Sequence, residues 1–291
     1  MQTWGAPREG SWRLRITHRT GVDYAGAVTS SYNEARMTPQ TNPHQAVLEA
    51  WVDIEPDGSS YRYWDYWGTQ VTAFDRQAPH DRLTVVATAV VETFADDLVD
   101  EERLRWSDLA DDAVSDEFDE FLVATPRTAL NPELQHHADR IRCEEPTPGE
   151  AALAACRLVN REVRYQAGAT SVHTRAVDAW AERIGVCQDL SHLVIGLIRG
   201  MGIPARYVSG YLHPKPNAPI GETVRGQSHA WVEWWDAGWR GYDPTNSKPL
   251  GRQHVVIGRG RDYADVSPLK GVYAGPKSTA HGVEVEVTRL R

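Results

Sequence analysis

The chain has 291 residues and a formal net charge of −9, with 40 Asp and Glu against 31 Lys and Arg. This balance argues against a nucleic-acid-binding protein, because such proteins carry a basic patch or stripe. Its three cysteines include no CxxC pair and form no disulfide framework, which favours a reducing compartment. The chain does not open with a basic segment followed by an apolar one, so we expect no secretory signal. It contains no run of about 18 apolar residues, so we expect no membrane span. We therefore expect a cytoplasmic protein with no nucleic-acid or membrane partner.

Residues 1–95 predict a β-sandwich domain. Apolar and polar residues alternate over 12–17, 48–54 and 83–91, which is the period of half-buried strands. The turn residues 56–58 lie between the second of these strands and the aromatic run 61–67, which predicts a hairpin. These aromatic side chains are either a carbohydrate platform or a structural feature, namely cross-strand pairs or an interdomain seam, and we favour the structural role.

Residues 96–145 predict an acidic helical linker. Apolar residues are interspersed among its many carboxylates, which indicates short amphipathic helices with a solvated acidic face. A cation site is disfavoured because the carboxylate spacing does not fit an EF-hand. A helix follows over about 126–140, where Asn131 and Pro132 match an N-cap and a first helical position. His136 and His137 point in different directions on that helix and make a poor metal chelate.

Helices are next predicted over 151–163, 176–183 and 187–201. The first follows a capping box at Thr147 and Glu150 and carries Cys156 among apolar residues, as a core thiol. Cys187 lies in the first turn of the third helix, where unpaired N–H groups and the helix dipole favour an anion such as a thiolate. Taken alone, it could also be a small buried core cysteine, because unreactive cysteines are usually buried.

Two strands after this helix carry the other residues needed for nucleophilic catalysis. His229 lies on the strand 227–234, and Asp243 ends the strand 239–243. Cysteine, histidine and aspartate in this order are typical of a triad in which the thiol attacks, the imidazole moves the proton and the carboxylate orients the imidazole. Alone, Asp243 could be an ordinary turn residue. Residues 213–226 between strands predict a loop that helps to form a substrate groove.

The segments GVCQDLSHLVIGLIRGMGIPARYVSGYL, SHAWVEWW, GWRGYDPTN and GRDYADVSPLKGVY resemble the bacterial transglutaminase-like family, which shares the papain-like cysteine peptidase fold. The stretch LRITHRTGVDYAGAVTSSYNEARMTP resembles the N-terminal β domain often attached to that core. The resemblance implies an α+β fold, with a nucleophile helix packed on an antiparallel sheet and a β-sandwich before it. The catalytic domain would span 146–291, and the strands 255–258 and 283–287 would close it.

Further roles follow from the resemblance. The backbone N–H of Cys187 would be one donor to the oxyanion, and Gln166 is a candidate for the second by analogy with the papain-like glutamine. Trp180 is the alternative, by analogy with the indole of animal transglutaminases, although its place on a helix favours packing. Asp189 is expected to cap the helix or bind the adjacent loop. His192 lies about 140° around the helix from the thiol and is expected to be buried.

The leading functional hypothesis is a hydrolase of a peptide or other amide bond that forms a thioester between substrate and Cys187. The same residues would serve a protein-glutamine transglutaminase, in which an amine intercepts the thioester. A catalytically silent binding module and a metal hydrolase that uses the triad as ligands are less favoured. We expect no cofactor and no metal, and a peptide, protein or small amide as substrate. The sequence does not specify the oligomeric state.

Overall fold

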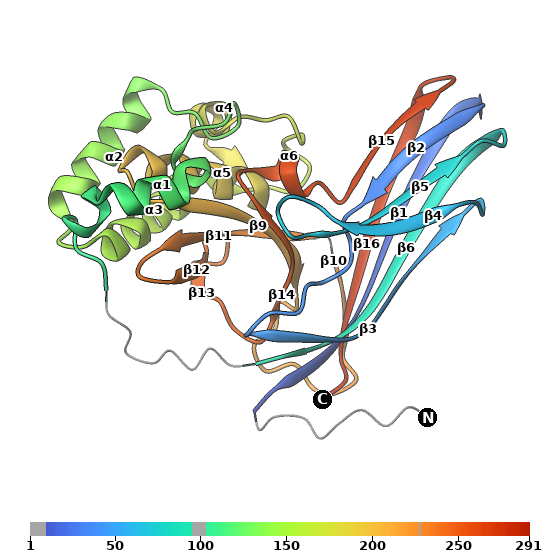
Figure 1. The fold of residues 1–291 in the computed structure, drawn as a ribbon, viewed down its shortest axis with the longest axis horizontal. Helices are drawn as coiled ribbons and strands as arrows, with labels where there is room; N and C mark the ends of the chain where they lie inside the picture. Colours follow the sequence, from blue (N-terminus) through green and yellow to red (C-terminus); the bar gives the residue numbers. More distant parts are fainter. Residues whose placement is uncertain (1–9, 95–102, 227) are drawn as a thin grey trace.

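A computed structural model describes residues 10–94, 103–226 and 228–291. Two parts lie side by side (Figure 1): one contains a five-stranded sheet and the helices, and the other consists of long strands in two sheets. The sheets of both parts are antiparallel, and only the short pair β7 (Arg164–Tyr165) and β8 (Ile184–Gly185) is parallel. The fold is therefore α+β, with a core that follows an N-terminal β-sandwich, as the sequence predicts.

The β-sandwich has two sheets, with the strand orders β10-β16-β1-β6-β3 and β15-β2-β5-β4. Alternate side chains of both sheets, such as Val22, Phe74 and Leu83, fill the space between them because successive residues of a strand point to opposite faces. The strands from the first part of the chain are β1 (Trp12–Val28), β2 (Ser30–Ala35), β3 (Gln45–Glu55), β4 (Ser60–Trp64), β5 (Gln70–Arg76) and β6 (His80–Thr93).

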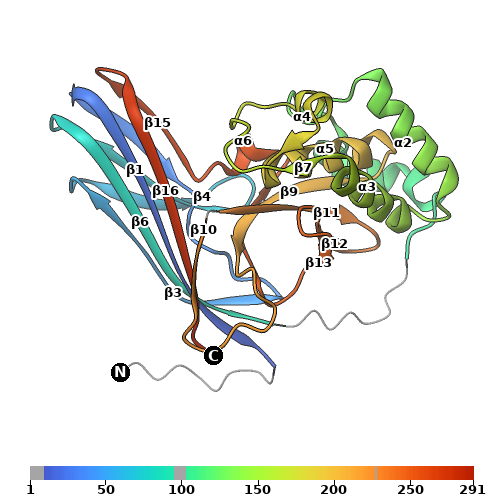
Figure 2. The ribbon, with the colours of Figure 1, turned by 180° about the vertical axis from the view of Figure 1, so that it is seen from behind.

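Three strands from the second half of the chain complete this sandwich: β10 (Thr223–Gly226), β15 (Leu269–Ala274) and β16 (Ser278–Arg289). Figure 2 shows β16, in red, running beside β1. The division of the chain into domains at residues 95 and 146 remains a prediction. Strand pairing joins the first of these domains to the last, since Val285 lies opposite His18 and Val287 lies opposite Ile16. The prediction that 283–287 closes the core sheet is wrong, because alternation indicates a strand but not its partner.

The hairpin predicted across residues 56–58 is also wrong. β3 pairs with β6 in the first sheet, whereas β4 pairs with β5 in the second, so the turn carries the chain from one sheet to the other. β4 ends at Trp64 because the Asp65 side chain accepts hydrogen bonds from the backbone of Trp67 and Thr69 and forms a turn. The rings of Tyr61 and Tyr63 stack with centroids 6.0 Å apart, but both lie on β4, so this is a contact along one strand and not the predicted cross-strand pair.

The core sheet has the strand order β13-β12-β11-β9-β14. Its central helix α5 (Cys187–Gly200) packs on β11 and β9, and nearly all of its residues after the first are buried, since they are apolar on several faces. The other strands and helices of the core are β9 (Ala205–Leu212), β11 (His229–Trp235), β12 (Trp239–Asp243), β13 (Lys248–Pro249), β14 (His254–Gly260), α2 (Pro132–Glu144), α3 (Pro148–Glu162), α4 (Ala176–Glu182) and α6 (Tyr263–Val266).

The helices around α5 begin where their caps predict. The Asn131 side chain accepts from the backbone N–H of Leu134 at 2.9 Å, so α2 starts at Pro132, as the cap predicts. The predicted start at about residue 126 is therefore too early. The Thr147 hydroxyl accepts from the N–H of Glu150 and donates to its carboxylate, which confirms the capping box of α3.

The acidic linker is described from residue 103 onward, and the predicted structure of 95–102 lies outside the described residues. It forms a 3-10 turn (Asp108–Ala110) and α1 (Asp112–Leu122). Phe118 of α1 is buried against Trp235 and Trp239, with ring centroids 4.5 and 5.6 Å apart, so this helix is amphipathic as predicted. Within the described ranges, no helix is long and apolar enough to span a membrane.

The sandwich and the core share a hydrophobic seam. Leu14 and Ile16 of β1 pack with Tyr211 of β9 and with Val255 and Ile257 of β14. A polar chain accompanies this seam, because the Tyr211 hydroxyl bonds His18 Nδ1 at 2.9 Å and donates to a backbone carbonyl at 3.1 Å. The two parts are therefore joined by buried apolar surface and by paired buried polar groups.

Candidate active site

Cys187 is the first residue of α5, directly after the short strand β8. The Asp189 carboxylate accepts from the backbone N–H of Val186 at 2.8 Å and from the Thr170 hydroxyl at 2.5 Å, which fixes the turn and the adjacent loop as predicted. Only glycine fits at Gly185, because a Cβ there would lie 2.9 Å from Asp189 Cβ and 3.2 Å from Leu190 Cδ1. This packing holds the half-buried thiol at the helix start.

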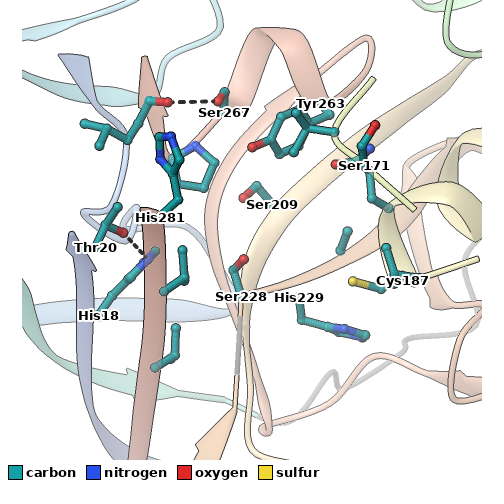
Figure 3. A pocket seen from close by; sticks show the side chains of 18 of the residues that line it. His18, Thr20, Ser171, Cys187, Ser209, Ser228, His229, Tyr263, Ser267 and His281 are labelled. Atoms are coloured by element: carbon teal, nitrogen blue, oxygen red, sulfur yellow. Dashed lines mark hydrogen bonds between the residues drawn. The ribbon is translucent and has the colours of Figure 1, made fainter. Parts of the chain in front are cut away.

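His229 and Asp243 meet across the core sheet. His229 opens β11 and Asp243 ends the neighbouring β12, and the His229 Nε2 bonds Asp243 Oδ2 at 2.8 Å. With Nε2 engaged, Nδ1 is the ring nitrogen that can face Cys187, and the nearby Cys187 thiol contributes to raising the pKa of the ring. The structure thus brings the three predicted side chains into one cluster, and Figure 3 shows Cys187 and His229 close together.

Asp243 is fully buried and is surrounded by donors. Its Oδ1 accepts from the backbone N–H groups of Thr245 and Asn246, both at 3.0 Å. Its Oδ2 accepts from the Asn246 side chain at 2.7 Å and lies 3.4 Å from His254 Nε2, in addition to His229. This set of donors holds the carboxylate in one orientation and stabilises its charge.

The charges of this cluster follow from its contacts. Burial alone would raise the pKa of Asp243, but the hydrogen bonds from His229 and His254 lower it well below the usual value. Burial alone would lower the pKa of His229, but the bonds to Asp243 and Cys187 raise it to about 9. His229 is therefore an imidazolium at neutral pH, stabilised by its partners.

A cleft of about 950 Å³ opens over Cys187 and His229. One wall comes from the core and the other from strands β1, β15 and β16 of the sandwich. In Figure 3 the hydroxyls of Ser209 and Ser228 lie between the Cys187–His229 pair and the opposite wall at His18. Pro214, Val224 and Arg225 also line the cleft, which agrees with the groove role predicted for residues 213–226, although residues 223–226 form the strand β10 and not a loop.

Models of two protein families match the chain. The model described as bacterial transglutaminase-like N-terminal region matches residues 14–92, and the model described as transglutaminase-like superfamily matches residues 135–244. An uncharacterized protein of Mycobacterium leprae is 47% identical over 279 residues, which cover 96% of this chain and 99% of that protein. The chain belongs to the transglutaminase-like superfamily.

Two further similarities bear on this transglutaminase-like protein. A solved structure described as "a Putative Cysteine Protease from Cytophaga hutchinsonii" is similar to it with a TM-score of 0.76 and 24% identity, over 97% of this chain and 92% of that chain. This likeness shows a shared fold. A protein-glutamine gamma-glutamyltransferase of Pseudomonas aeruginosa is 31% identical over 123 residues, which cover 40% of this chain and 18% of that protein.

The two candidates for the second oxyanion donor lie outside the cleft of this transglutaminase-like protein. The Gln166 backbone bonds Gly185, but its side chain is exposed, accepts from Arg164 at 3.1 Å and is not among the lining residues. Trp180 is buried and donates its indole N–H to Glu133 at 2.8 Å, which fits the packing role. Tyr165, next to Gln166, lines the cleft instead. The oxyanion role of Gln166 stays a prediction without support from this geometry.

The remaining cysteines and His192 lie apart from the cluster in this transglutaminase-like protein. Cys156 is buried, and burial raises the pKa of its thiol, so it is the predicted core thiol. Cys143 is exposed on α2. His192 is fully buried, and its Nε2 accepts from the backbone N–H of Tyr263 at 3.2 Å, as the helix geometry predicts.

The sequence analysis did not identify one residue that contacts the cluster of Cys187, His229 and Asp243 in this transglutaminase-like protein. His254 reaches Asp243 from β14, eleven residues away in the chain, and no motif marks that position. Asn246 is closer to the motif, and a bond within the turn is what the DPTN segment predicts.

Within the parts of the chain that the structure describes, no group of three or more His, Cys, Asp or Glu side chains is arranged to hold a metal ion.

Proposed function

We propose that this protein is a cysteine-dependent hydrolase of amide or peptide bonds, with Cys187 as nucleophile, His229 as acid and base, and Asp243 as the group that orients the imidazole. Membership in the transglutaminase-like superfamily supports an enzyme at that coarse level. The observation that carries the proposal is the His229 ring, which bonds the buried Asp243 through Nε2 at 2.8 Å and lines the same cleft as the thiol at the start of α5 (Figure 3).

The proposed reaction has two halves. In the first, the Cys187 sulfur attacks the carbonyl carbon, and the His229 imidazolium gives its proton to the leaving nitrogen as the C–N bond breaks. The oxyanion of the intermediate is stabilised by the backbone N–H of Cys187, the first residue of α5. In the second half, His229 takes a proton from water, the hydroxide attacks the thioester, and the acid product and the Cys187 thiol are released.

Acyl transfer to an amine is the second candidate. The similarity to the gamma-glutamyltransferase of Pseudomonas aeruginosa, which covers 40% of this chain, favours it. The first half of the reaction would be the same, and an amine would replace water in the second. The competition between water and amine for one thioester therefore decides between the two functions.

The test begins with the thiol. The full chain is incubated with 2-chloroacetamide, and the labelled cysteine is mapped by mass spectrometry. We expect Cys187 to react first and its labelling at pH 6 to be lost in His229→Ala, whereas Cys143→Ser, the matched control, leaves it unchanged. Faster labelling of Cys143, or full labelling of Cys187 in His229→Ala, would overturn the proposal.

A second experiment separates hydrolysis from transfer. Peptides that contain glutamine are incubated with the protein, with and without a primary amine, and the products are identified by mass. Hydrolysis yields an acid or a cleaved peptide in both samples, whereas transfer yields an adduct of the peptide with the amine. The Cys187→Ala variant, in which no thioester can form, is the control for both products.

A further inference from the structure

The cleft over Cys187 differs in charge from the rest of the molecule. The whole chain carries 40 acidic residues, yet none of the described residues that line the cleft is Asp or Glu. Besides the His229 imidazolium, the charged side chains that line it are Arg127, Arg225 and Lys270. An acidic protein with a basic cleft concentrates positive potential at that cleft, where low-dielectric walls strengthen its effect on a ligand.

Arg127 lies on the core side of the cleft, near the loop that Asp189 holds. Its Nε donates to the backbone carbonyl of Val172 at 3.3 Å, which also lines the cleft. In the described part of the chain, no Asp or Glu oxygen lies within ion-pair distance of its guanidinium. A half-buried arginine usually has a carboxylate partner. Because Arg127 has none among the described residues, its guanidinium can bind an anion from outside the chain.

Lys270 lies on the opposite wall, on β15 of the sandwich. Its Nζ donates to the backbone carbonyl of Ala264. Of the three carboxylates that act on it, Asp262 accepts from the backbone of Ala264, and the other two have arginine partners. Glu34 pairs with Arg36 at 2.9 Å, and Asp265 pairs with Arg261 at 3.0 Å. The positive charge of Lys270 is therefore only partly compensated within the described chain.

Arg225 provides the contrast. It also lines the cleft, but its Nε bonds Glu286 at 2.7 Å and lies 3.8 Å from Glu284, on the neighbouring strand β16. Its charge is largely neutralised by these two carboxylates. The net positive character of the cleft thus rests on Arg127 and Lys270, one on each wall.

We propose that the substrate is a carboxylate-bearing peptide, that is, an acidic segment whose side chains bind Arg127 and Lys270 while its amide lies over Cys187. This rests on the proposed function, since it names the substrate of the same site. Arginine recognises a carboxylate through two parallel hydrogen bonds, and lysine attracts it as a point charge. The two walls would hold the acidic segment across the cleft and disfavour a basic one by like-charge repulsion.

The experiment uses two nearly isosteric probes, chloroacetyl-glutamate and chloroacetyl-glutamine amide, which carry the same reactive group and differ in charge. The second-order rate of Cys187 alkylation is measured for both on the full chain, at low and high salt. We expect the acidic probe to react about tenfold faster at low salt, as a charge-assisted contact would give, with a smaller ratio at high salt. The ratio of the two rates cancels any effect common to both probes.

The variants assign the preference to the two cations. Arg127→Gln and Lys270→Gln should each lower the ratio, and the double variant should bring it close to one. Arg127→Lys should restore part of it, and Arg161→Gln, the control on an exposed part of α3 outside the cleft, should keep it. Equal rates in the unmodified protein, or a ratio that survives the double variant, would overturn the proposal. Absence of Cys187 labelling by neutral 2-chloroacetamide would instead overturn the proposed function, so the two failures are distinguishable.

Discussion

The ring of His18 on β1 bonds through Nδ1 to the hydroxyl of Tyr211 on β9, at 2.9 Å. The hydroxyl in turn donates to the backbone carbonyl of Met37 at 3.1 Å, and the Thr20 hydroxyl bonds the other ring nitrogen of His18 at 3.0 Å. Burial lowers the pKa of His18 to about 4, so the ring is neutral and can donate from one nitrogen and accept at the other. This chain joins the sandwich to the core beside the cleft.

The Tyr211→Phe substitution should destabilise the protein. It removes a fully buried hydroxyl and leaves an N–H of His18 and the Met37 carbonyl without that partner, at a cost of about 1–3 kcal/mol. The free energy of unfolding in urea measures the loss. Tyr61→Phe, whose ring is 67% exposed, is the control and should change stability by less than about 0.5 kcal/mol. Equal effects of the two substitutions would contradict a role for the chain of hydrogen bonds.

His229 should hold its proton up to about pH 9. Burial opposes the charge, but the bonds to Asp243 and Cys187 raise its pKa above the ordinary value of 6.5. Because the folded protein binds this proton more tightly than the unfolded chain, the resulting stability is complete below pH 6.5 and is lost as the pH rises through 9. Nitrogen NMR of the ring measures the titration. Cys187→Ala should shift it to lower pH, and an unchanged titration would show that the thiol is not its partner.

Asp243→Asn should slow the alkylation of Cys187 by about tenfold, because the His229 ring loses the carboxylate that orients it beside the thiol. Asn246→Ala removes one donor to Asp243 Oδ2, at 2.7 Å in the unmodified protein, and should have a smaller effect. The free energy of unfolding in urea is measured on the same variants. A slow reaction of Asp243→Asn that comes with an unfolded chain would point to lost folding instead.

Gly185→Ala should impair both stability and labelling of Cys187. The added Cβ would lie 2.9 Å from Asp189 Cβ, and the turn before the helix would have to shift. We expect a loss of about 1–3 kcal/mol, as for overpacking in a closed site. Gly251→Ala is the matched control, since nothing lies within 4 Å of its added carbon. Thermal unfolding and the alkylation rate are measured on both variants, and equivalent behaviour would contradict the tight fit.

The elements with strong local signals were the predictable ones. The start of α5 at Cys187 follows from an apolar helical pattern after a glycine turn, and the starts of α2 and α3 follow from Asn131 and Thr147, whose side chains bond the first turn. His229 and Asp243 could be placed on strands because the short stretches 227–234 and 239–243 that contain them have strand patterns of their own. These signals act within a few residues of the chain.

The relationships between distant segments were not predictable in the same way. The alternating residues of β16 indicate a strand, but its place beside β1 depends on which apolar face it covers. The contact of His254 with Asp243 depends on the position of β14 in the sheet. The basic character of the cleft likewise arises only when Arg127 and Lys270 meet from two parts of the molecule.

The return of β16 to the side of β1 has a consequence for biosynthesis. Ile16 and Val287 are paired neighbours, although 271 positions separate them in the chain. As the polypeptide leaves the ribosome, about 270 further residues have to be translated after β1 before its second flank is covered. The nascent sandwich therefore exposes an open strand edge for most of translation, which is the period when a chaperone would be of most use.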